Sequence, residues 1–455
     1  MTFCGPRRLR TRLLFLTSCL TLLCWSFTYS YHYLDNETST SSLLTRLRNF
    51  KPPERERKVG GTVLHETQDI PEFQFYSPYR GSPDVEFEEM LDSALKEIER
   101  KLRLERTERE GWPKKIWQVW LSKGWQPGDL DSDGFIPEKE AQDGKEDQKI
   151  RYMKAWKEVN PDYEHTLLTD LKADTFVSTY YSSIPALVHL YRTFPVPVMK
   201  ADLLRYLLLF IYGGVWVDHD VWPVKPLSAC PFQIHLPTSE SGVSPHTSLL
   251  VGIEIDEPFV TAKTRRHWHW SRIYGLIQYH MVAKPFSPFL RRAIVRVVAH
   301  AYAHGKRKNS GVKGLWGWVS TNGGVWTGEY SEIEILEITG PGVWTDAILD
   351  TLTDAVLKSP TPQTKGFLDT VGGEERVTWR AFSGITKPTE VVLMPGASAS
   401  VSVEVEPMGI YVLPINYWGN GQRHSGAKNF RAGEACVNHL FLRSWKKGWY
   451  EWAFG

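Results

Sequence analysis

Two carboxylates stand one residue apart at the end of an apolar segment, in the stretch GGVWVDHD from Gly213 to Asp220. The letters after the two glycines have strand composition, and alternate side chains of a strand share one face. We therefore expect Asp218 and Asp220 to emerge together, while His219 faces the core with the valines. Two like charges this close need a cation between them, and oxygen ligands suit Mg²⁺ or Mn²⁺. The stretch predicts a divalent-metal site, with an exposed turn as the alternative.

A phosphatase of the haloacid dehalogenase type, which uses the first aspartate of such a pair as its nucleophile, is not expected. Trp222 stands where that pattern needs a small branched residue. No Asp-Asp pair occurs later in the chain to complete its magnesium site.

The elements around this pair predict an α/β domain. Strands are expected at PKKIWQVWL and YEHTLLT, and helices near 152–159, 171–180, 184–191 and 200–212, the last ended by Gly213-Gly214. Alternating strands and helices favour a mostly parallel sheet, which binds ligands at the carboxyl ends of its strands. Asp202 and Arg205 share one face of the helix 200–212. They predict a site pair, with a surface ion pair as the alternative.

The composition is that of a folded protein with a large core. Of 455 residues, 42% are hydrophobic and 23% charged, and the net charge of +2 leaves no positive field to attract nucleic acid. Four arginines precede an uncharged run, so residues 1–12 are expected to be a cytosolic tail and 13–30 a signal-anchor helix. Residues 31–112 then form a lumenal stem, with a glycosylation sequon at Asn36, and 113–455 the catalytic domain with a C-terminal extension.

Three further features are weighed from the residues alone. An apolar stripe predicts a stem helix near 84–110, packed on the main domain or mediating self-association. Cys230 and Cys436 are the two cysteines beyond the anchor region, and whether they pair is left open. The loop from Asp129 to Glu140 has an EF-hand spacing, with ligand positions at Asp129, Asp131, Asp133 and Glu140. Since no helix precedes it, an acidic surface insert is expected, and a Ca²⁺ site is the alternative.

The segment KADLLRYLLLFIYGGVWVDHDVWPVKPL resembles the Asp-x-Asp signature of the fungal glycosyltransferase family 32. PKKIWQVW and NPDYEHTLLTD are similar to its opening blocks. LLVGIEID, RRHWHWSRIYGLIQYHMVAKPFSPFL, EITGPGVWTDAIL and YVLPINYW with GQRHSGAKN resemble its branch of Golgi initiation-specific α-1,6-mannosyltransferases. The resemblance implies a GT-A type, Rossmann-like α/β fold and an enzyme that transfers mannose from GDP-mannose. It further implies Mn²⁺, with Mg²⁺ as a substitute, an N-glycan acceptor on glycoproteins, and a single-pass type II protein of the Golgi membrane with a lumenal catalytic domain.

The resemblance also suggests roles for single residues. Asp220 would bind the metal directly, while Asp218 would contact the donor's ribose or sugar and reach the metal through water. His424 would be a third ligand or phosphate contact. Asp202 and Arg205 would hold the donor's sugar hydroxyls and phosphate. The other expected donor contacts are Trp120 against the guanine, Gln118 beside it, Tyr212 in the same pocket, and Asp346 in a loop 340–346 over the sugar.

Two departures from the family pattern bear on the substrate. His219 stands between the aspartates where the family has an aliphatic residue, and HWHW at 267–270 lacks a Gln that the branch more often shows. One alternative is an inositolphosphoceramide mannosyltransferase of the same fold, since those relatives share the Asp-x-Asp segment. The alternative of another class is a non-enzymatic lumenal sugar- or calcium-binding module. A homo- or hetero-oligomer through the stem helix is a further expectation.

Overall fold

A computed structural model describes residues 81–105, 111–121, 144–230, 243–268, 270–309, 330–358, 360, 362–371, 373–394 and 407–441. All of these belong to one compact unit, Glu66–Gly455. The expected tail, the anchor, most of the stem and the acidic loop Asp129–Glu140 lie outside the described residues. Within the described ranges, no helix is long and apolar enough to cross a bilayer.

One large sheet organises the described chain. Its strands are β1 (Lys115–Trp120), β2 (Glu164–Thr169), β3 (Gly214–Val217), β5 (Thr247–Asp256), β6 (Tyr274–Leu276), β7 (His280–Ala283), β10 (Thr389–Leu393) and β11 (Met408–Leu413). Their order is β10-β11-β5-β7-β3-β1-β2, with β6 paired to β5. Two small ladders join β4 (Val221–Pro223) to β12 (Val437–His439) and β8 (Leu368–Val371) to β9 (Glu374–Val377).

The strand directions confirm the α/β class but not a mostly parallel sheet. β1 runs parallel to β2 and β3, and β5 runs parallel to β11. Between these groups β7 runs antiparallel to both β3 and β5, so the sheet is mixed. Because β3 and β5 are both antiparallel to β7, they run parallel to each other. The carboxyl ends of β1, β2, β3, β5 and β11 therefore meet at one edge, which we call the site edge.

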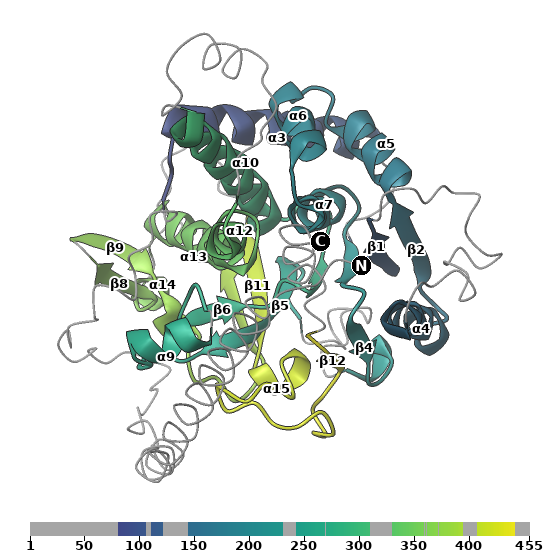
Figure 1. The fold of residues 1–455 in the computed structure, drawn as a ribbon. Helices are drawn as coiled ribbons and strands as arrows, with labels where there is room; N and C mark the ends of the chain where they lie inside the picture. Colours follow the sequence, from purple (N-terminus) through teal and green to yellow (C-terminus); the bar gives the residue numbers. More distant parts are fainter. Residues whose placement is uncertain are drawn as a thin grey trace, which may run out of the picture. The chain divides into compact units, whose positions relative to one another are not determined.

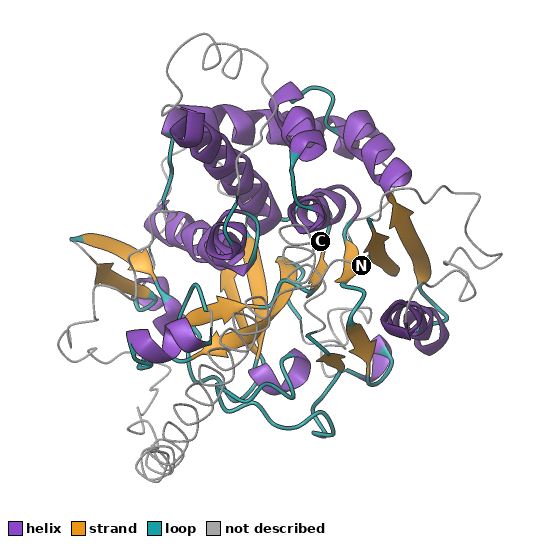
Figure 2. Cartoon of the chain, viewed as in Figure 1, coloured by secondary structure: helices purple, strands orange, loops and turns teal. Residues whose placement is uncertain are grey.

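Helices cover both faces of this sheet (Figures 1 and 2). They are α3 (Val85–Glu105), α4 (Gly144–Val159), α5 (Asp170–Tyr180), α6 (Pro185–Thr193), α7 (Pro197–Tyr212), α9 (Ala262–His267), α10 (Pro288–Asn309), α12 (Glu332–Ile338), α13 (Pro341–Lys358), α14 (Pro362–Lys365) and α15 (Ile415–Trp418). Short 3₁₀ turns span Leu227–Ala229 and Trp379–Ala381. The larger core lies under α7, α10 and α13. A smaller core on the other face contains Trp156 of α4 and Trp418 of α15.

The expected stem helix is α3, and it packs on the main domain. Leu91, Leu95 and Ile98 are buried in the larger core. Arg291 of α10 also donates to Asp92 at 2.9 Å and to Glu99 at 3.0 Å. The apolar stripe thus contacts this chain itself, as the first of the two alternatives predicted.

The predicted chain reversal after α7 depends on two glycines with positive φ. Gly213 has φ +63° and Gly214 has φ +95°. A Cβ on Gly214 would lie 2.6 Å from the carbonyl oxygen of Lys115, because β1 and β3 pair closely there. The reversal allows the buried helix α7 to be followed at once by the central strand β3.

Gly214→Ala tests this constraint. We expect it to lower the free energy of unfolding by about 2–4 kcal/mol, because strain at positive φ adds to a backbone clash. Gly373→Ala is the matched control, since Gly373 has φ +86° with no atom within 4 Å of its Cβ position. Urea unfolding of the purified variants measures both effects. Equal losses at the two positions would show that the close approach to β1 carries no cost.

Candidate active site

The carboxylate pair lies at the site edge, but not as the alternation pattern predicts. β3 ends at Val217, and the chain turns through residues 218–220 before β4. The Asp218 amide donates to the Tyr279 carbonyl at 2.9 Å, and the Val221 amide closes the turn onto the Asp218 carbonyl at 3.1 Å. Since the residues are in a turn, period-two alternation does not apply to them. His219 is half-buried 6.0 Å from the Trp120 ring, so the prediction that it faces the core is wrong.

Arg205 ties this turn to the buried helix α7. Its guanidinium contacts the carboxylate of Asp202 at 2.7 Å and that of Asp218 at 3.5 Å. It also donates to the Gln278 carbonyl at 3.0 Å. Asp202 and Arg205 are each only 4% exposed, so the surface-pair alternative is wrong. The pair is therefore buried and joined to the turn through Asp218, and its role in a site stays a prediction.

Asp202 is held in a mainly apolar setting. The Thr339 hydroxyl donates to it at 2.9 Å. Burial raises the pKa of Asp202 to about 7, although Arg205 and Thr339 favour its charged form. A single guanidinium here faces two carboxylates, of which Asp202 is the more deeply buried.

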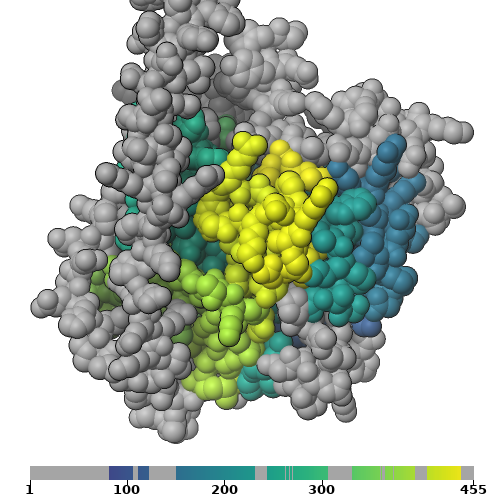
Figure 3. Space-filling view, turned by 90° about the horizontal axis from the view of Figure 1, so that it is seen from below, coloured from purple at the N-terminus to yellow at the C-terminus, as the bar shows by residue number. Residues whose placement is uncertain are grey.

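A C-terminal histidine reaches the pair, and it is His439 rather than His424. His439 Nε2 lies 3.2 Å from Asp220 Oδ1, and its ring stacks on Tyr279 at 4.0 Å. Strand β12 carries His439 and pairs antiparallel with β4, which places His439 opposite Val221. In Figure 3 the yellow C-terminal residues lie beside teal residues of the central chain on this face.

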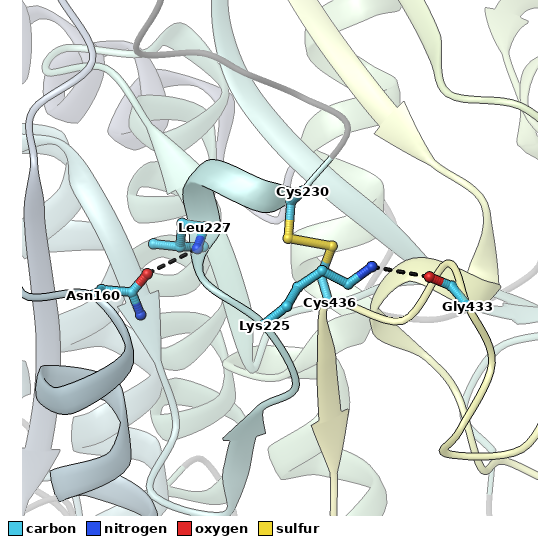
Figure 4. The surroundings of a disulfide bond; sticks show 6 residues. All are labelled: Asn160, Lys225, Leu227, Cys230, Gly433 and Cys436. Carbon is cyan, nitrogen blue, oxygen red and sulfur yellow. Dashed lines mark hydrogen bonds between the residues drawn. A yellow bond between two sulfur atoms is a disulfide. The ribbon is translucent and has the colours of Figure 1, made fainter.

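A disulfide holds this C-terminal segment in place (Figure 4). Cys230 and Cys436 are bonded across 206 residues of sequence, with a Cα–Cα distance of 6.0 Å. Lys225 reinforces the junction by donating to the Gly433 carbonyl at 2.9 Å, and the Leu227 amide donates to Asn160 at 2.8 Å. The pairing left open by the sequence is therefore present, and it lies three residues before His439.

Nearby carboxylates favour the protonated, positively charged form of His439. Burial lowers the pKa of His439, but Asp220, Glu254 and Asp218 together outweigh it and raise that pKa above its usual value. Burial raises the pKa of Glu254 to about 7, against the attraction of His439. The sequence prediction missed both His439 and Glu254. Two features of the sequence could have indicated these residues. His439 follows Cys436 by three residues, and Glu254 stands near the end of an apolar strand.

These side chains fit a divalent cation in kind and in charge. Within the described ranges, no three His, Cys, Asp or Glu side chains lie together in a group that could hold a metal ion. Asp220 and His439 nevertheless present oxygen and nitrogen atoms side by side, and buried Nδ1 of His439 has no hydrogen-bond partner. The carboxylates of Asp218, Asp220 and Glu254 give the pocket a negative field. Such a set suits Mn²⁺ or Mg²⁺ when a ligand's oxygens complete it.

The predicted base pocket is only partly assembled. Trp120 ends β1 at the site edge, where it is 8% exposed and lies beside His219. Gln118 is fully buried, and its Oε1 lies 2.7 Å from Nε2 of His165. Gln118 therefore does not reach a ligand in this arrangement, because it is an inward position of β1.

Tyr212 and Asp346 lie apart from the carboxylate pair. Tyr212 precedes β3, at the opposite edge of the sheet, and its hydroxyl donates to that of Tyr180 at 2.7 Å. Residues 341–346 begin helix α13 and do not form a loop over the sugar. Asp346 is buried and paired with Arg272, which also contacts Glu337 at 2.8 Å. Neither residue lies where it was predicted, because the nearby sequence does not show at which edge of the sheet a helix will end or begin.

His424 belongs to a different cluster. Its ring centroid lies 4.5 Å from that of Trp270 and 5.6 Å from that of Trp268. Burial lowers the pKa of His424 to about 4, so its ring is neutral near pH 7 and adds no charge to a phosphate. His424 thus lies with these aromatic rings and the Ser425 hydroxyl, while the histidine that contacts Asp220 is His439.

Comparisons with known proteins agree with this site. The family described as "Glycosyltransferase sugar-binding region containing DXD motif" matches residues 146–238, which include Asp202, Arg205, Asp218 and Asp220. With the mixed sheet and its site edge, this match supports the predicted nucleotide-sugar transferase fold. The chain is a glycosyltransferase.

The relatives are fungal mannosyltransferases. The chain is 26% identical to the "Initiation-specific alpha-1,6-mannosyltransferase" of Candida albicans, over 74% of this chain and 73% of that protein. It is also 26% identical to the Schizosaccharomyces pombe protein of the same name, over 65% of this chain and 60% of that protein. The resemblance expected from the motifs is thus confirmed.

A solved structure titled "PaToxG Glycosyltransferase" aligns with 62% of this chain and 87% of that chain, at 16% identity and a TM-score of 0.31. That score is too low to support the fold. The fold assignment therefore depends on the strand order itself.

Arg205→Met tests the framework of the site. Removing the guanidinium leaves Asp202 buried without its counter-charge, so we expect unfolding free energy to fall by about 3–5 kcal/mol. Arg100→Met is the matched control, because Arg100 and Glu97 form an i,i+3 pair like Asp202 and Arg205 but on an exposed face of α3. Urea unfolding should leave the control's midpoint unchanged. Similar midpoints for both variants would mean that Arg205 does not neutralise the buried carboxylate.

Proposed function

We propose that this glycosyltransferase moves mannose from GDP-mannose to a mannose of an N-glycan in α-1,6 linkage, with retention of configuration and with Mn²⁺ or Mg²⁺ at Asp218, Asp220 and His439. The observation that carries the proposal is the contact of His439 with Asp220, beside the turn whose Asp218 contacts Arg205. It occurs in a chain that is similar over most of its length to named α-1,6-mannosyltransferases. Sites of this fold class bind nucleotides at that edge.

The chemistry follows from the charge that develops when the donor's C1–O bond breaks. The departing GDP carries the negative charge of its diphosphate, and its release would be eased by the charge that a bound Mn²⁺ or Mg²⁺ supplies. Asp220 and His439 would hold that cation, while Arg205 on the buried helix α7 contacts Asp218 and fixes its position. Trp120 at the end of β1 offers an aromatic surface for the guanine.

Retention is proposed without a covalent intermediate. The acceptor hydroxyl would attack C1 from the face that GDP leaves, and an oxygen of the departing diphosphate would take the hydroxyl proton. The C1–O bond to GDP breaks as the bond to the acceptor oxygen forms, so charge and protons balance. NMR of the product's anomeric signal would test this, since a β-mannoside would contradict it.

The similarity that supports the sphingolipid alternative extends over only a short part of the chain. The "Inositol phosphoceramide mannosyltransferase 3" of Schizosaccharomyces pombe is 32% identical, but over 24% of this chain and 29% of that protein. The initiation-specific relative of Candida albicans matches over far more of the chain, 74% of it. We therefore favour the N-glycan acceptor. A type II Golgi location follows as part of the proposal from the basic and apolar N-terminal sequence.

A donor survey tests the substrate. The purified protein is incubated with Mn²⁺, α-methyl mannoside and, in turn, GDP-mannose, GDP-fucose, UDP-galactose or UDP-N-acetylglucosamine. We expect only GDP-mannose to be consumed and EDTA to stop the reaction. Consumption of a UDP-sugar alone would overturn the donor assignment.

Variants test the ligand set. Asp220→Asn and His439→Asn should each reduce GDP release from GDP-mannose about 100-fold, because each removes a proposed contact to the cation. His424→Asn, the matched histidine control, should keep GDP release in the absence of acceptor within about twofold. Direct titration with Mn²⁺ should show weaker binding for the first two variants alone. Normal Mn²⁺ binding by His439→Asn would place the third ligand elsewhere.

A further inference from the structure

Two tryptophans and a histidine form a cluster outside the carboxylate site. The rings of Trp268 and Trp270 stack at 5.5 Å with an interplanar angle of 21°. The His424 ring stands edge-on to both, at 71° to Trp268 and 69° to Trp270. Trp268 is 38% exposed, and Trp270 and His424 are half-buried. We call these three residues the aromatic cluster.

Hydrogen bonds hold the cluster in one arrangement. Ser425 has a positive φ of 56°, which is unfavourable for a residue with a Cβ. Its amide donates to Glu257 at 2.5 Å, and its hydroxyl accepts from the Asp256 amide at 2.9 Å. Nδ1 of His424 also contacts that hydroxyl at 2.9 Å. The loop that carries His424 is thus fastened to the end of β5, and the histidine edge is held against the indoles.

The cluster extends the site edge away from the carboxylates. Trp268 and Trp270 follow β5, whose carboxyl end is Asp256, and His424 lies in the connection that follows β11. β5 is separated from β3 by β7 alone, so the two parallel strands are about 10 Å apart. The cluster therefore lies on the side of the carboxylate turn opposite to Trp120, which ends β1.

The chemistry of the cluster suits a carbohydrate. A pyranose ring has an apolar C–H face that packs on an indole, while its hydroxyls need polar partners at the rim. Within the described part of the chain, Nε2 of His424 has no hydrogen-bond partner. Because burial lowers the pKa of His424 to about 4, the neutral ring can accept or donate a hydrogen bond without attracting phosphate. The neighbours Lys263 and His267 are exposed and polar, which makes an acyl chain a poor occupant.

We propose that Trp268, Trp270 and His424 form a subsite for the acceptor glycan, one that binds sugar units remote from the reacting hydroxyl. The inference rests on the proposed function and assigns a specificity role within it. The donor's base lies toward Trp120 and the acceptor chain toward β5, with the carboxylate turn between them. The cluster selects extended oligosaccharides over single sugars.

Acceptor kinetics test the subsite. Trp268→Ala, Trp270→Ala and His424→Ala are compared with the parent, using GDP-mannose with either a high-mannose N-glycan oligosaccharide or α-methyl mannoside. We expect KM for the oligosaccharide to rise about tenfold, which is the effect of losing one aromatic contact. GDP release without acceptor and the kinetics with α-methyl mannoside should change less than about twofold, since the carboxylate site is untouched. Trp270→Phe should restore most of the loss.

Trp112→Ala is the matched control, because Trp112 is a half-buried tryptophan that precedes β1 at the opposite edge of the sheet. It should leave the oligosaccharide KM unchanged. The proposal would be overturned if the cluster variants raised KM equally for the oligosaccharide and for α-methyl mannoside. An unchanged KM for the oligosaccharide would overturn it as well. Loss of binding to phosphatidylcholine vesicles with unchanged acceptor kinetics would make the cluster a membrane contact instead.

A binding measurement separates this proposal from the donor assignment. Calorimetric titration of the parent and Trp270→Ala with the oligosaccharide alone needs no donor. If the parent binds and the variant does not, the subsite stands even where GDP-mannose is not consumed. If the parent consumes GDP-mannose but neither protein distinguishes the oligosaccharide from α-methyl mannoside, the subsite fails and the function stands.

Discussion

The buried guanidinium of Arg205 is the interaction on which the site depends. It lies between the carboxylates of Asp202 on α7 and Asp218 after β3, and it is 4% exposed. An unpaired charge at that depth costs several kcal/mol, so helix, strand and turn are held in one relative position by a single cation. When Asp220 and Glu254 are also counted, the carboxylates near the turn outnumber the single guanidinium of Arg205. The divalent cation proposed for this site would supply positive charge that the carboxylates favour.

The second requirement is that strand β12, far along the chain, lie beside the carboxylate turn. The Cys230–Cys436 disulfide and the β4–β12 ladder do this together, and they place His439 against Asp220. A disulfide constrains the unfolded chain most when the enclosed loop is long, and 206 residues separate these two cysteines. The site is therefore completed by a residue far away in sequence, and its geometry depends on an oxidising environment. This agrees with the lumenal location proposed for the domain.

The site edge also separates the residues proposed for the donor from those proposed for the acceptor. Trp120 ends β1 on one side of the turn, and the aromatic cluster follows β5 and β11 on the other. Because parallel strands end at the same edge, residues from four connections contribute to one surface. Strand β7 lies between β3 and β5 and separates their carboxyl ends, and because it is antiparallel its own carboxyl end lies at the opposite edge. Its sequence, HMVA, is too short and too apolar to reveal its direction.

The sequence by itself determined the helices, most strands, the reversal at Gly213-Gly214 and the membership of Asp202, Arg205, Asp218 and Asp220 in one site. Local composition and spacing specify these features, because glycine freedom, helix period and strand composition act over a few residues. Tertiary structure alone decided which distant residues join them. It ended β3 at Val217, sent Tyr212 to the opposite edge, buried Asp346 beside Arg272, and chose His439 over His424. Those outcomes depend on the strand order and on the disulfide, which act across hundreds of residues and leave no local pattern to read.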